Sequence, residues 1–288
     1  MKIETISLQG TAEWNEDALV NHERLRMYGV LDGATSLHPY RGPNNETGGH
    51  LASRHIQSFL ESLEEADMPE DSLKPLVVQA NARLRSKMLE AGVDVTDKAS
   101  LWTSGLALIR VHDTYIDFAQ AGDCMIAAVY KDGAIRTLSR DQVAHVDLLS
   151  KRVWEQGIRQ GITKRESLWE LARPVIVGNK AKMNKPEGYS VLSGEPELAD
   201  FIEYGRINRI QLKALLLVTD GLFPPAELAT RENPAYDAMR ELTLQVAEQS
   251  LAEYADKLVR LEREDPDCLL YPRFKVSDDK TGIWIRFE

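Results

Sequence analysis

Residues 27–33 read MYGVLDG, an apolar run that ends in the pair Asp32-Gly33. Three other apolar runs end in the same way: YIDFAQAGD at Asp123, LLLVTDG at Asp220-Gly221, and FKVSDD at Asp278-Asp279. A carboxylate at the end of a buried strand is held rigidly by the sheet and still reaches its rim. A neighbouring glycine lets the backbone turn tightly and approach a ligand. We therefore expect these runs to be buried strands whose ends carry the functional groups.

Glu16 and Asp17, which precede the first of these runs, add two more carboxylates with no obvious basic partner. Clustered like charges are costly unless they are protonated or neutralised by a cation. Carboxylate oxygens are hard ligands, so the expected cation is Mg²⁺ or Mn²⁺ and not zinc. A single Asp-Gly pair more often marks a turn, and Asp132-Gly133 between two strand-like runs is such a case. Recurrence at the ends of apolar strands is what favours a site.

The pattern around these runs predicts α+β layers in one domain over residues 1–288, because strands lie at both ends with helix pairs between them. No linker rich in Pro, Gly or Ser divides the chain. We expect β structure over 1–34, and helices over 50–65, 70–91 and 235–263 from their apolar spacing. The remaining expected strands are 101–111, 115–121, 125–130, 134–138, 190–192, 215–218 and 282–287. Residues 141–187 have no clear period.

Composition narrows the classes of function. The net charge of −10 argues against a nucleic-acid partner, which would need a broad basic surface. No apolar run approaches the roughly 18 residues of a membrane span, and MKIETISLQG lacks the apolar core of a signal peptide. Two cysteines form no disulfide framework, which fits a reducing compartment. We expect a cytoplasmic protein that neither binds nucleic acid nor enters a membrane. Its oligomeric state is open.

The quoted motifs resemble those of the metal-dependent protein phosphatases of type 2C, in the order of that family and over nearly the whole chain. They are Asn15-Glu16-Asp17-Ala18, Gly29-Val30-Leu31-Asp32-Gly33, Thr103-Ser104-Gly105, Ala121-Gly122-Asp123-Cys124, Leu138-Ser139-Arg140-Asp141, Leu217-Val218-Thr219-Asp220-Gly221-Leu222 and Ser277-Asp278-Asp279-Lys280-Thr281. Each motif is weak alone, but the series is specific. The final motif differs from the family's Asp-Asn-x-Thr in having Asp279 at the Asn position.

The resemblance implies a four-layer α-β-β-α sandwich of two antiparallel sheets flanked by helix pairs, with the site at one edge. It implies two Mn²⁺ or Mg²⁺ ions that activate a water to hydrolyse phosphoserine or phosphothreonine esters in a phosphorylated protein substrate. Asp32 would bridge the two ions and Gly33 would add its carbonyl. Asp17, Asp220 and Asp278 would complete the ligands, and Asp123 would bind a third, weaker ion.

The chain departs from the family where the phosphate should bind. Many members have an arginine three residues before the Asn of the first motif, and this position is Ala12 here. The usual His-Gly-Gly or Met-Gly-Gly after Asp-Gly is displaced to residues 48–50 by an insertion. Because His38 and Arg41 lie in that insertion, we hypothesise that one of them contacts phosphate or protonates the leaving group. The backbone N–H groups at 48–50 are a further candidate for binding an anion.

Residues of about 141–187 correspond to a flap beside the site in the family, and 151–185 hold nine Lys/Arg against three Glu. Such a basic flap could recruit phosphorylated partners, or it could be an ordinary solvated surface. Two other functions stay open: a pseudophosphatase that acts as a binding module, and a phosphatase for a small phosphorylated metabolite. Retention of four mutually repelling aspartates argues against the first. Neither cysteine has the arginine spacing of a cysteine-based phosphatase, and no phosphate-binding P-loop is present.

Overall fold

Two five-stranded antiparallel sheets form the centre of the computed structural model, which describes residues 1–233 and 236–287. The first sheet has the order β1-β10-β9-β6-β7 and the second β2-β3-β4-β5-β8. Seven α-helices in the described residues pack around them. The strands are β1 Lys2–Leu8, β2 Asp17–His22, β3 Met27–Ala34, β4 Thr103–Val111, β5 Tyr115–Ala121, β6 Met125–Tyr130, β7 Ile135–Thr137, β8 Glu203–Asn208, β9 Leu212–Val218 and β10 Lys280–Arg286.

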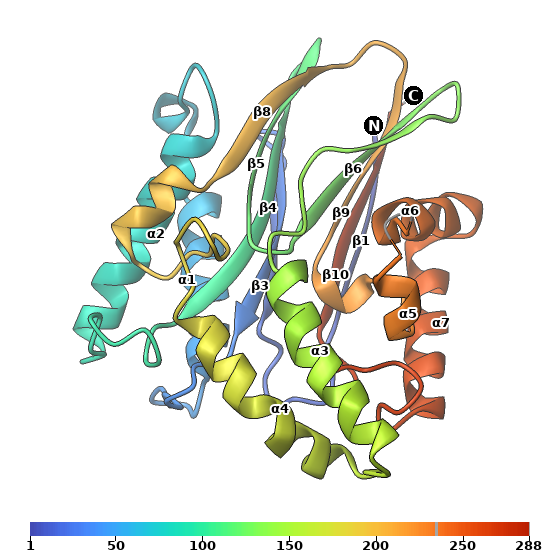
Figure 1. Cartoon of the computed structure of the whole chain (residues 1–288). Helices are drawn as coiled ribbons and strands as arrows, with labels where there is room; N and C mark the ends of the chain where they lie inside the picture. The colour runs from blue at the N-terminus through green and yellow to red at the C-terminus, as the bar shows by residue number, and fades with distance from the viewer. Residues whose placement is uncertain (234–235, 288) are drawn as a thin grey trace.

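Helices cover the outer face of each sheet, so the predicted four-layer α-β-β-α sandwich is confirmed (Figure 1). The helices are α1 Gly48–Glu61, α2 Lys74–Glu90, α3 Ala144–Arg159, α4 Arg165–Lys180, α5 Leu228–Arg231, α6 Ala238–Glu248 and α7 Leu251–Glu264. The pair α1 and α2 packs on the second sheet, and α6 and α7 pack on the first. None of the helices in the described residues is long and apolar enough to cross a membrane.

The central strands are apolar on both faces because each sheet is covered on both sides. In β9, Leu215 and Leu217 face the core between the sheets, whereas Leu216 and Val218 face α6 and α7. In the same way, Val30 of β3 lies in the core between the sheets. This is why the sequence shows continuous apolar runs in place of the alternation typical of a sheet with one solvated face.

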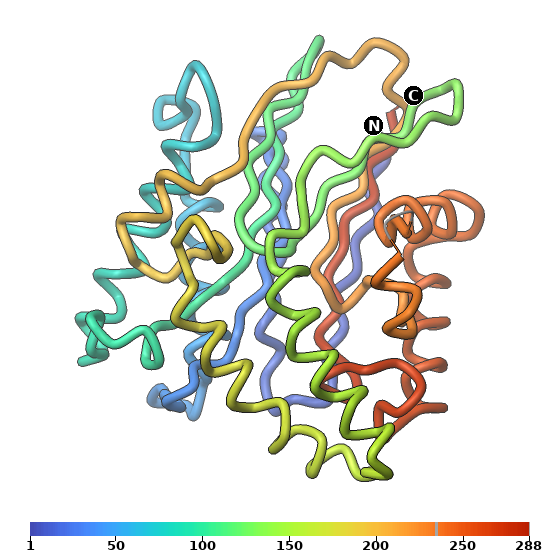
Figure 2. The backbone as a smooth tube through the Cα atoms, in the orientation of Figure 1, coloured from blue at the N-terminus to red at the C-terminus, as the bar shows by residue number. Residues whose placement is uncertain are grey.

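Strand pairing brings the two ends of the chain together. β1 pairs with β10 from Lys2 opposite Arg286 to Leu8 opposite Lys280. The termini therefore lie at one end of the sandwich, and helices α3 and α4 lie at the other (Figure 2). Residues 141–187, whose structure the sequence pattern did not indicate, thus form a helical hairpin across the end where β3 finishes. We call it the α3–α4 hairpin.

Several features of the structure differ from the sequence prediction. Residues 190–192 are not a strand but make one isolated bridge, Leu192 to Ser104. β8 was not predicted, because this edge strand is largely polar. The single long helix expected over 235–263 is two helices that break at Gln249 and Ser250; its predicted first residue lies outside the described residues. Ser250 caps α7 by accepting a hydrogen bond from the backbone N–H of Glu253 at 3.1 Å.

Candidate functional site

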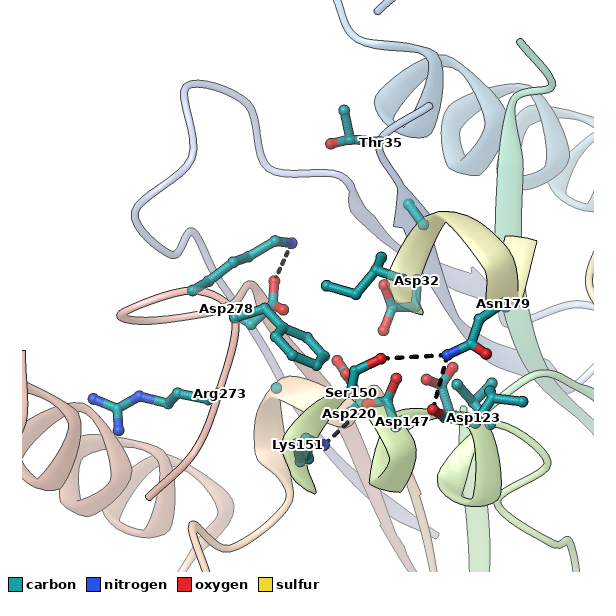
Figure 3. A pocket seen from close by; sticks show the side chains of 18 of the residues that line it. Asp32, Thr35, Asp123, Asp147, Ser150, Lys151, Asn179, Asp220, Arg273 and Asp278 are labelled. Carbon is teal, nitrogen blue, oxygen red and sulfur yellow. Dashed lines mark hydrogen bonds and ion pairs between the residues drawn. The ribbon is translucent and has the colours of Figure 1, made fainter. Parts of the chain in front are cut away.

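Five aspartates from both sheets gather at the end of the sandwich that the α3–α4 hairpin covers. Asp17 begins β2 and Asp32 lies near the end of β3; Asp123 lies in the turn between β5 and β6. Asp220 follows β9, and Asp278 precedes β10. In Figure 3 the carboxyl groups of Asp32, Asp123, Asp220 and Asp278 point toward a common cavity. Asp32, Asp123 and Asp220 end or follow buried strands, as expected from the sequence, whereas the run 274–279 forms no strand and Asp278 lies in a loop that leads into β10.

Asp17 and Asp32 are directly opposite each other in the β2–β3 ladder. Like charges in facing positions of a sheet repel each other, and Asp17 is only 1% exposed. The hydroxyl of Thr219, which follows β9, donates to Asp17 Oδ2 at 2.8 Å. This bond ties the carboxylate of one sheet to the other sheet and orients it.

Tight backbone contacts explain the glycine after Asp32. A Cβ at Gly33 would lie 2.3 Å from the carbonyl oxygen of Gly49 and 2.5 Å from that of Glu16. The N-terminus of α1 can therefore pack against the end of β3 only if residue 33 has no side chain. Glu16, which is 2% exposed, accepts hydrogen bonds from the hydroxyls of Thr35, at 2.7 Å, and Thr47. These two bonds hold the Glu16 carboxylate between the end of β3 and the start of α1.

The turn that carries Asp123 depends on Gly122, which has a φ of +82°. The carbonyl oxygen of Gly122 accepts from the side chain of Gln120 at 2.6 Å and from the backbone of Gln142 at 3.2 Å. These bonds tie the turn to the segment leading into α3. The neighbouring Cys124 is fully buried.

The two adjacent aspartates before β10, Asp278 and Asp279, make different contacts. Asp279 is 3% exposed and accepts from the backbone N–H groups of Gly10 at 2.7 Å and Glu16 at 2.8 Å. Asp278 lines the cavity and pairs with Lys275, whose Nζ is 2.6 Å from its Oδ1. Asp279 thus holds the loop that bears Glu16, and Asp278 is available to a ligand.

Burial and mutual repulsion raise the pKa values of four of the clustered aspartates. Desolvation is the largest cause that raises the pKa of Asp32, followed by the charges of Asp220 and Asp17. Desolvation likewise raises the pKa of Asp17 and Asp123. It raises the pKa of Asp220 to about 6, with a further contribution from the Asp278 carboxylate. A bound cation would remove this repulsion and favour the ionised forms.

The cavity beside these aspartates has a volume of about 720 Å³. Its walls include Val146 and Asp147 of α3, and Trp169 and Ile176 of α4. Asn179 of α4 is anchored to α3 by its amide, which donates to the carbonyl oxygen of Val146 at 2.8 Å. The α3–α4 hairpin therefore forms one wall of the candidate active site, as Figure 3 shows for Asp147 and Asn179.

His38 and Arg41 are not brought to this cavity. The His38 imidazole is 70% exposed and lies 2.9 Å from the carboxylate of Asp97. The Arg41 guanidinium pairs with Glu13 at 3.3 Å on the surface. Neither residue is among those that line the cavity. Geometry therefore gives no support to the hypothesis that one of them contacts phosphate, which stays a prediction from sequence.

Residues 48–50 do begin α1, as expected, but their surroundings are acidic. The first-turn N–H of His50 is capped by the hydroxyl of Thr47 at 3.2 Å. A Cβ at Gly49 would lie 2.7 Å from Oε1 of Glu16. An anion at this helix N-terminus would thus meet a buried carboxylate.

The donor set fits hard divalent cations. Within residues 1–233 and 236–287, no three Asp, Glu, His or Cys side chains are close enough to hold an ion by themselves. Mg²⁺ keeps several water ligands and is commonly bound through one or two carboxylates, so an open site suits it. The carboxylates also repel one another, and a cation relieves that repulsion.

Sequence reasoning missed three groups at the site. Asp147 comes from α3, which the sequence did not predict, and its charge raises the pKa of Asp123 after desolvation and the charges of Asp220 and Asp141. Thr219 was quoted only as part of a motif, although a threonine just before Asp220 could have suggested a carboxylate-orienting hydroxyl. Lys275, three residues before Asp278, had no signal because it lies in an irregular loop.

Known proteins share the family and the fold of this chain. Residues 9–261 match the family described as Protein phosphatase 2C. No curated protein matches the chain closely enough to be called a relative. The solved structure of the serine/threonine phosphatase Stp1 from Staphylococcus aureus has a TM-score of 0.59 at 17% identity, covering 100% of this chain and 95% of that chain.

Two structures of the phosphatase PstP are similar as well. That of Mycobacterium tuberculosis PstP has a TM-score of 0.54 at 18% identity, with 100% of this chain and 98% of that chain covered. The catalytic domain of PstP in complex with 2 manganese ions gives 0.54 at 17% identity, with coverage of 99% and 97%. Likeness at such identities supports the fold alone, whereas the family match spans most of the sequence. The chain therefore belongs to the protein phosphatase 2C family.

Proposed function

We propose that this chain hydrolyses phosphoserine and phosphothreonine esters in proteins with the help of two divalent cations, Mn²⁺ or Mg²⁺. The observation that carries the proposal is the cluster of buried aspartates that both sheets contribute to one cavity. Such a cluster weakens the fold unless it binds cations. Family membership adds the reaction class.

The proposed ligands are the carboxylates of Asp17, Asp32, Asp220 and Asp278 and the carbonyl of Gly33. Asp32 would hold both cations, as the family resemblance implies. The charges of the other four aspartates, after desolvation, raise its pKa, so it lies within the cluster. Asp123 would serve a third, weaker ion. When bound, the cations would lower the pKa of a water and offset the charge of the phosphoryl group.

The other residues of the site would orient these ligands and limit access. Thr219 holds Asp17 by its hydrogen bond of 2.8 Å. Asp279 holds the backbone at Glu16 at 2.8 Å, which keeps the start of β2 in register with β3. The α3–α4 hairpin narrows the entrance and excludes part of the solvent, which strengthens electrostatic interactions inside the cavity.

A small phosphorylated metabolite is the second candidate substrate. The cavity of about 720 Å³ lies within the roughly 300–1,000 Å³ range of small-molecule pockets, and the α3–α4 hairpin encloses it on one side. A phosphoprotein would instead have to present its phosphorylated residue on an extended segment. Turnover of phosphopeptides compared with free phosphometabolites of similar charge separates the two substrate classes.

Hydrolysis of p-nitrophenyl phosphate tests the reaction itself, with Mn²⁺, with Mg²⁺ and with EDTA, for the wild type and Asp220→Ala. We expect turnover with a divalent cation that is lost with EDTA and in the variant. A wild type that binds Mn²⁺ and stays inactive on aryl phosphates and phosphopeptides would contradict the proposal. It would favour the pseudophosphatase, a binding module that retains the fold.

A further inference from the structure

A phosphoryl group that enters this cavity needs a positive partner, because the cavity floor is lined with carboxylates. Six of the side chains that line the cavity are cationic: Lys151, Arg165, Lys180, Arg231, Arg273 and Lys275. A cation that already spends its donors on fixed partners has little left for a substrate. The contacts of the six therefore decide which of them could bind phosphate.

Four of the six contact groups other than the five clustered aspartates. Arg273 donates to the Asp265 carboxylate at 2.6 Å and to backbone carbonyls as well. Lys151 pairs at 2.9 Å with Asp147, one turn earlier on α3. Arg165 donates to a backbone carbonyl oxygen at 3.1 Å and pairs with Glu166 at 3.3 Å, and Arg231 donates to a backbone carbonyl oxygen at 3.2 Å. In the described part of the chain neither pairs with a clustered aspartate. These four side chains brace the walls of the cavity.

Lys180 and Lys275 remain. Lys180, at the end of α4, donates to the hydroxyl of Thr103 at 3.3 Å. Lys275 is different, because its Nζ lies 2.6 Å from Oδ1 of Asp278, a proposed cation ligand. Within the described part of the chain it is the only one of the six that pairs with a proposed ligand. Its side chain is 36% exposed and lines the cavity.

The two oxygens of Asp278 are not equivalent. Oδ1 accepts from Lys275 and from the backbone N–H of Asp279, at 2.6 and 2.9 Å. Among the described residues, no hydrogen bond to Oδ2 is found. A cation can therefore bind through Oδ2 while Lys275 stays on Oδ1. The dashed line at Asp278 in Figure 3 is this ion pair, at the edge of the cavity that Asp32 and Asp220 share.

The loop that carries Lys275, residues 265–279, is held on both sides. On one side the indole of Trp154 in α3 donates to the carbonyl oxygen of Cys268 at 3.0 Å, and both side chains are fully buried. On the other side Lys280 donates to Ser277 Oγ at 3.0 Å and to the carbonyl oxygen of Asp278 at 2.9 Å. Lys275 is thus presented from a braced loop, which lowers the entropy lost when it contacts a ligand.

We propose that Lys275 binds the phosphoryl group of the substrate, donating from Nζ to a non-bridging oxygen while it stays paired with Asp278. The proposal rests on the proposed function for its substrate class. An ammonium group has three donors in a flexible tetrahedral arrangement, so one can remain on Asp278 and another can reach the substrate. Lys275 would then supply positive charge that an arginine supplies in other phosphate sites.

Binding of inorganic phosphate to the Mn²⁺-loaded protein, measured by calorimetry, tests this proposal without requiring turnover. The variants are Lys275→Met, which keeps the length of the side chain, and Lys275→Arg, which keeps its charge. Lys87→Met is the matched control, because Lys87 forms a pair of the same i,i+3 spacing and 2.6 Å length with Glu90 on α2, away from the cavity. Mn²⁺ affinity and the melting temperature are measured for each variant.

We expect Lys275→Met to weaken phosphate binding by about tenfold to a hundredfold, the loss of one charge-assisted hydrogen bond. Lys275→Arg should stay within a few-fold of the wild type, and Lys87→Met should equal it. Mn²⁺ should still bind to Lys275→Met, because that variant removes a positive neighbour of Asp278. For p-nitrophenyl phosphate, the Lys275→Met defect should lie mainly in KM.

Three results would overturn the proposal. One is phosphate binding by Lys275→Met that equals the wild type. Another is loss of Mn²⁺ binding in that variant, which would make Lys275 a residue that positions Asp278. The third is a Mn²⁺-loaded wild type that does not bind phosphate. A wild type that binds Mn²⁺ and phosphate but hydrolyses nothing contradicts only the proposed function, and the comparison of variants still stands.

Discussion

Replacing Asp32 with asparagine removes one charge from the buried aspartate cluster and keeps the shape of the side chain. Asp32 faces Asp17 directly across the β2–β3 ladder, and desolvation and the neighbouring carboxylates both raise its pKa. In the metal-free protein this charge opposes folding. We therefore expect Asp32→Asn to stabilise the metal-free protein, although the variant loses the proposed bridging ligand.

The size of this stabilisation follows from the distance between Asp17 and Asp32, which face each other in the β2–β3 pairing. Facing residues in an antiparallel pair have Cβ atoms about 5 Å apart. Two unit charges at about 5 Å and an effective dielectric constant of about 20 repel by about 3 kcal/mol. Because the pKa of Asp32 is raised, protonation relieves part of this repulsion, and the net gain is about 2 kcal/mol. This gain corresponds to a rise of roughly 3 °C in melting temperature for a domain of this size.

The assay is thermal and urea unfolding in EDTA and in excess Mn²⁺. Asp117→Asn is the matched control, because Asp117 is also buried, at 5% exposure, but is bonded by the guanidinium of Arg206 at 2.6 and 3.0 Å. Asp117→Asn should destabilise the protein by about 1–2 kcal/mol both in EDTA and in excess Mn²⁺, because it weakens the bonds to Arg206. Wild type should gain about 2.7 kcal/mol from Mn²⁺ at a hundredfold excess over its Kd, and Asp32→Asn should gain much less.

The order of stability between wild type and Asp32→Asn should thus reverse when Mn²⁺ is added. The reasoning would be refuted if Asp32→Asn were less stable than wild type in EDTA. It would also be refuted if Mn²⁺ stabilised both proteins equally. Either result would mean that the aspartates are not a repelling cluster that awaits a cation.

Three further predictions concern other parts of the molecule. Burial lowers the pKa of Lys180 to about 8 from 10.5, so its buried charge costs stability below pH 8 and this cost declines as pH rises toward 10.5. Lys180→Met should accordingly stabilise the protein more at pH 7 than at pH 10 by up to about 3 kcal/mol, and an equal gain at both values in urea unfolding would contradict this. Gly122→Ala should cost about 1–2 kcal/mol in the same assay, because φ at Gly122 is +82°; a neutral result would show that the turn relaxes. His38→Ala and Arg41→Ala should retain near-wild-type turnover of p-nitrophenyl phosphate, and a tenfold loss in either would restore the sequence-based hypothesis.

The sequence predicted the layers and the ends of β3, β5 and β9 well, because burial on both faces produces continuous apolar runs. The run 274–279 is instead an irregular loop. Asp32 and Asp220 could be recognised because each ends such a run at a glycine. The sequence also contains a signal for the break between α6 and α7, but the continuous apolar spacing over 235–263 masks it. Ser250 followed three residues later by Glu253 is the sequence signature of a capping box, and Ser250 does accept from the backbone N–H of Glu253 at the start of α7.

Other features could not be predicted, for physical reasons. β8 is an edge strand whose pairing comes from β5 and whose side chains, such as Arg206, are mostly polar, so no period marks it. The α3–α4 hairpin packs its apolar residues on the 265–279 loop, a partner distant in sequence. Lys275 reaches the site only because that loop is braced by Arg273 and Lys280. Its role depends on tertiary contacts that a local pattern does not encode.

Calorimetric titration of Mn²⁺ into the metal-free chain tests the central claim most directly, with Asp32→Asn titrated in parallel. We expect two Mn²⁺ ions bound per wild-type chain, with a weaker third at most, and loss of at least one of the two in the variant. A wild-type chain that binds no Mn²⁺ at millimolar concentration, or a variant that binds it as the wild type does, would contradict the claim that these aspartates form a two-cation phosphatase centre.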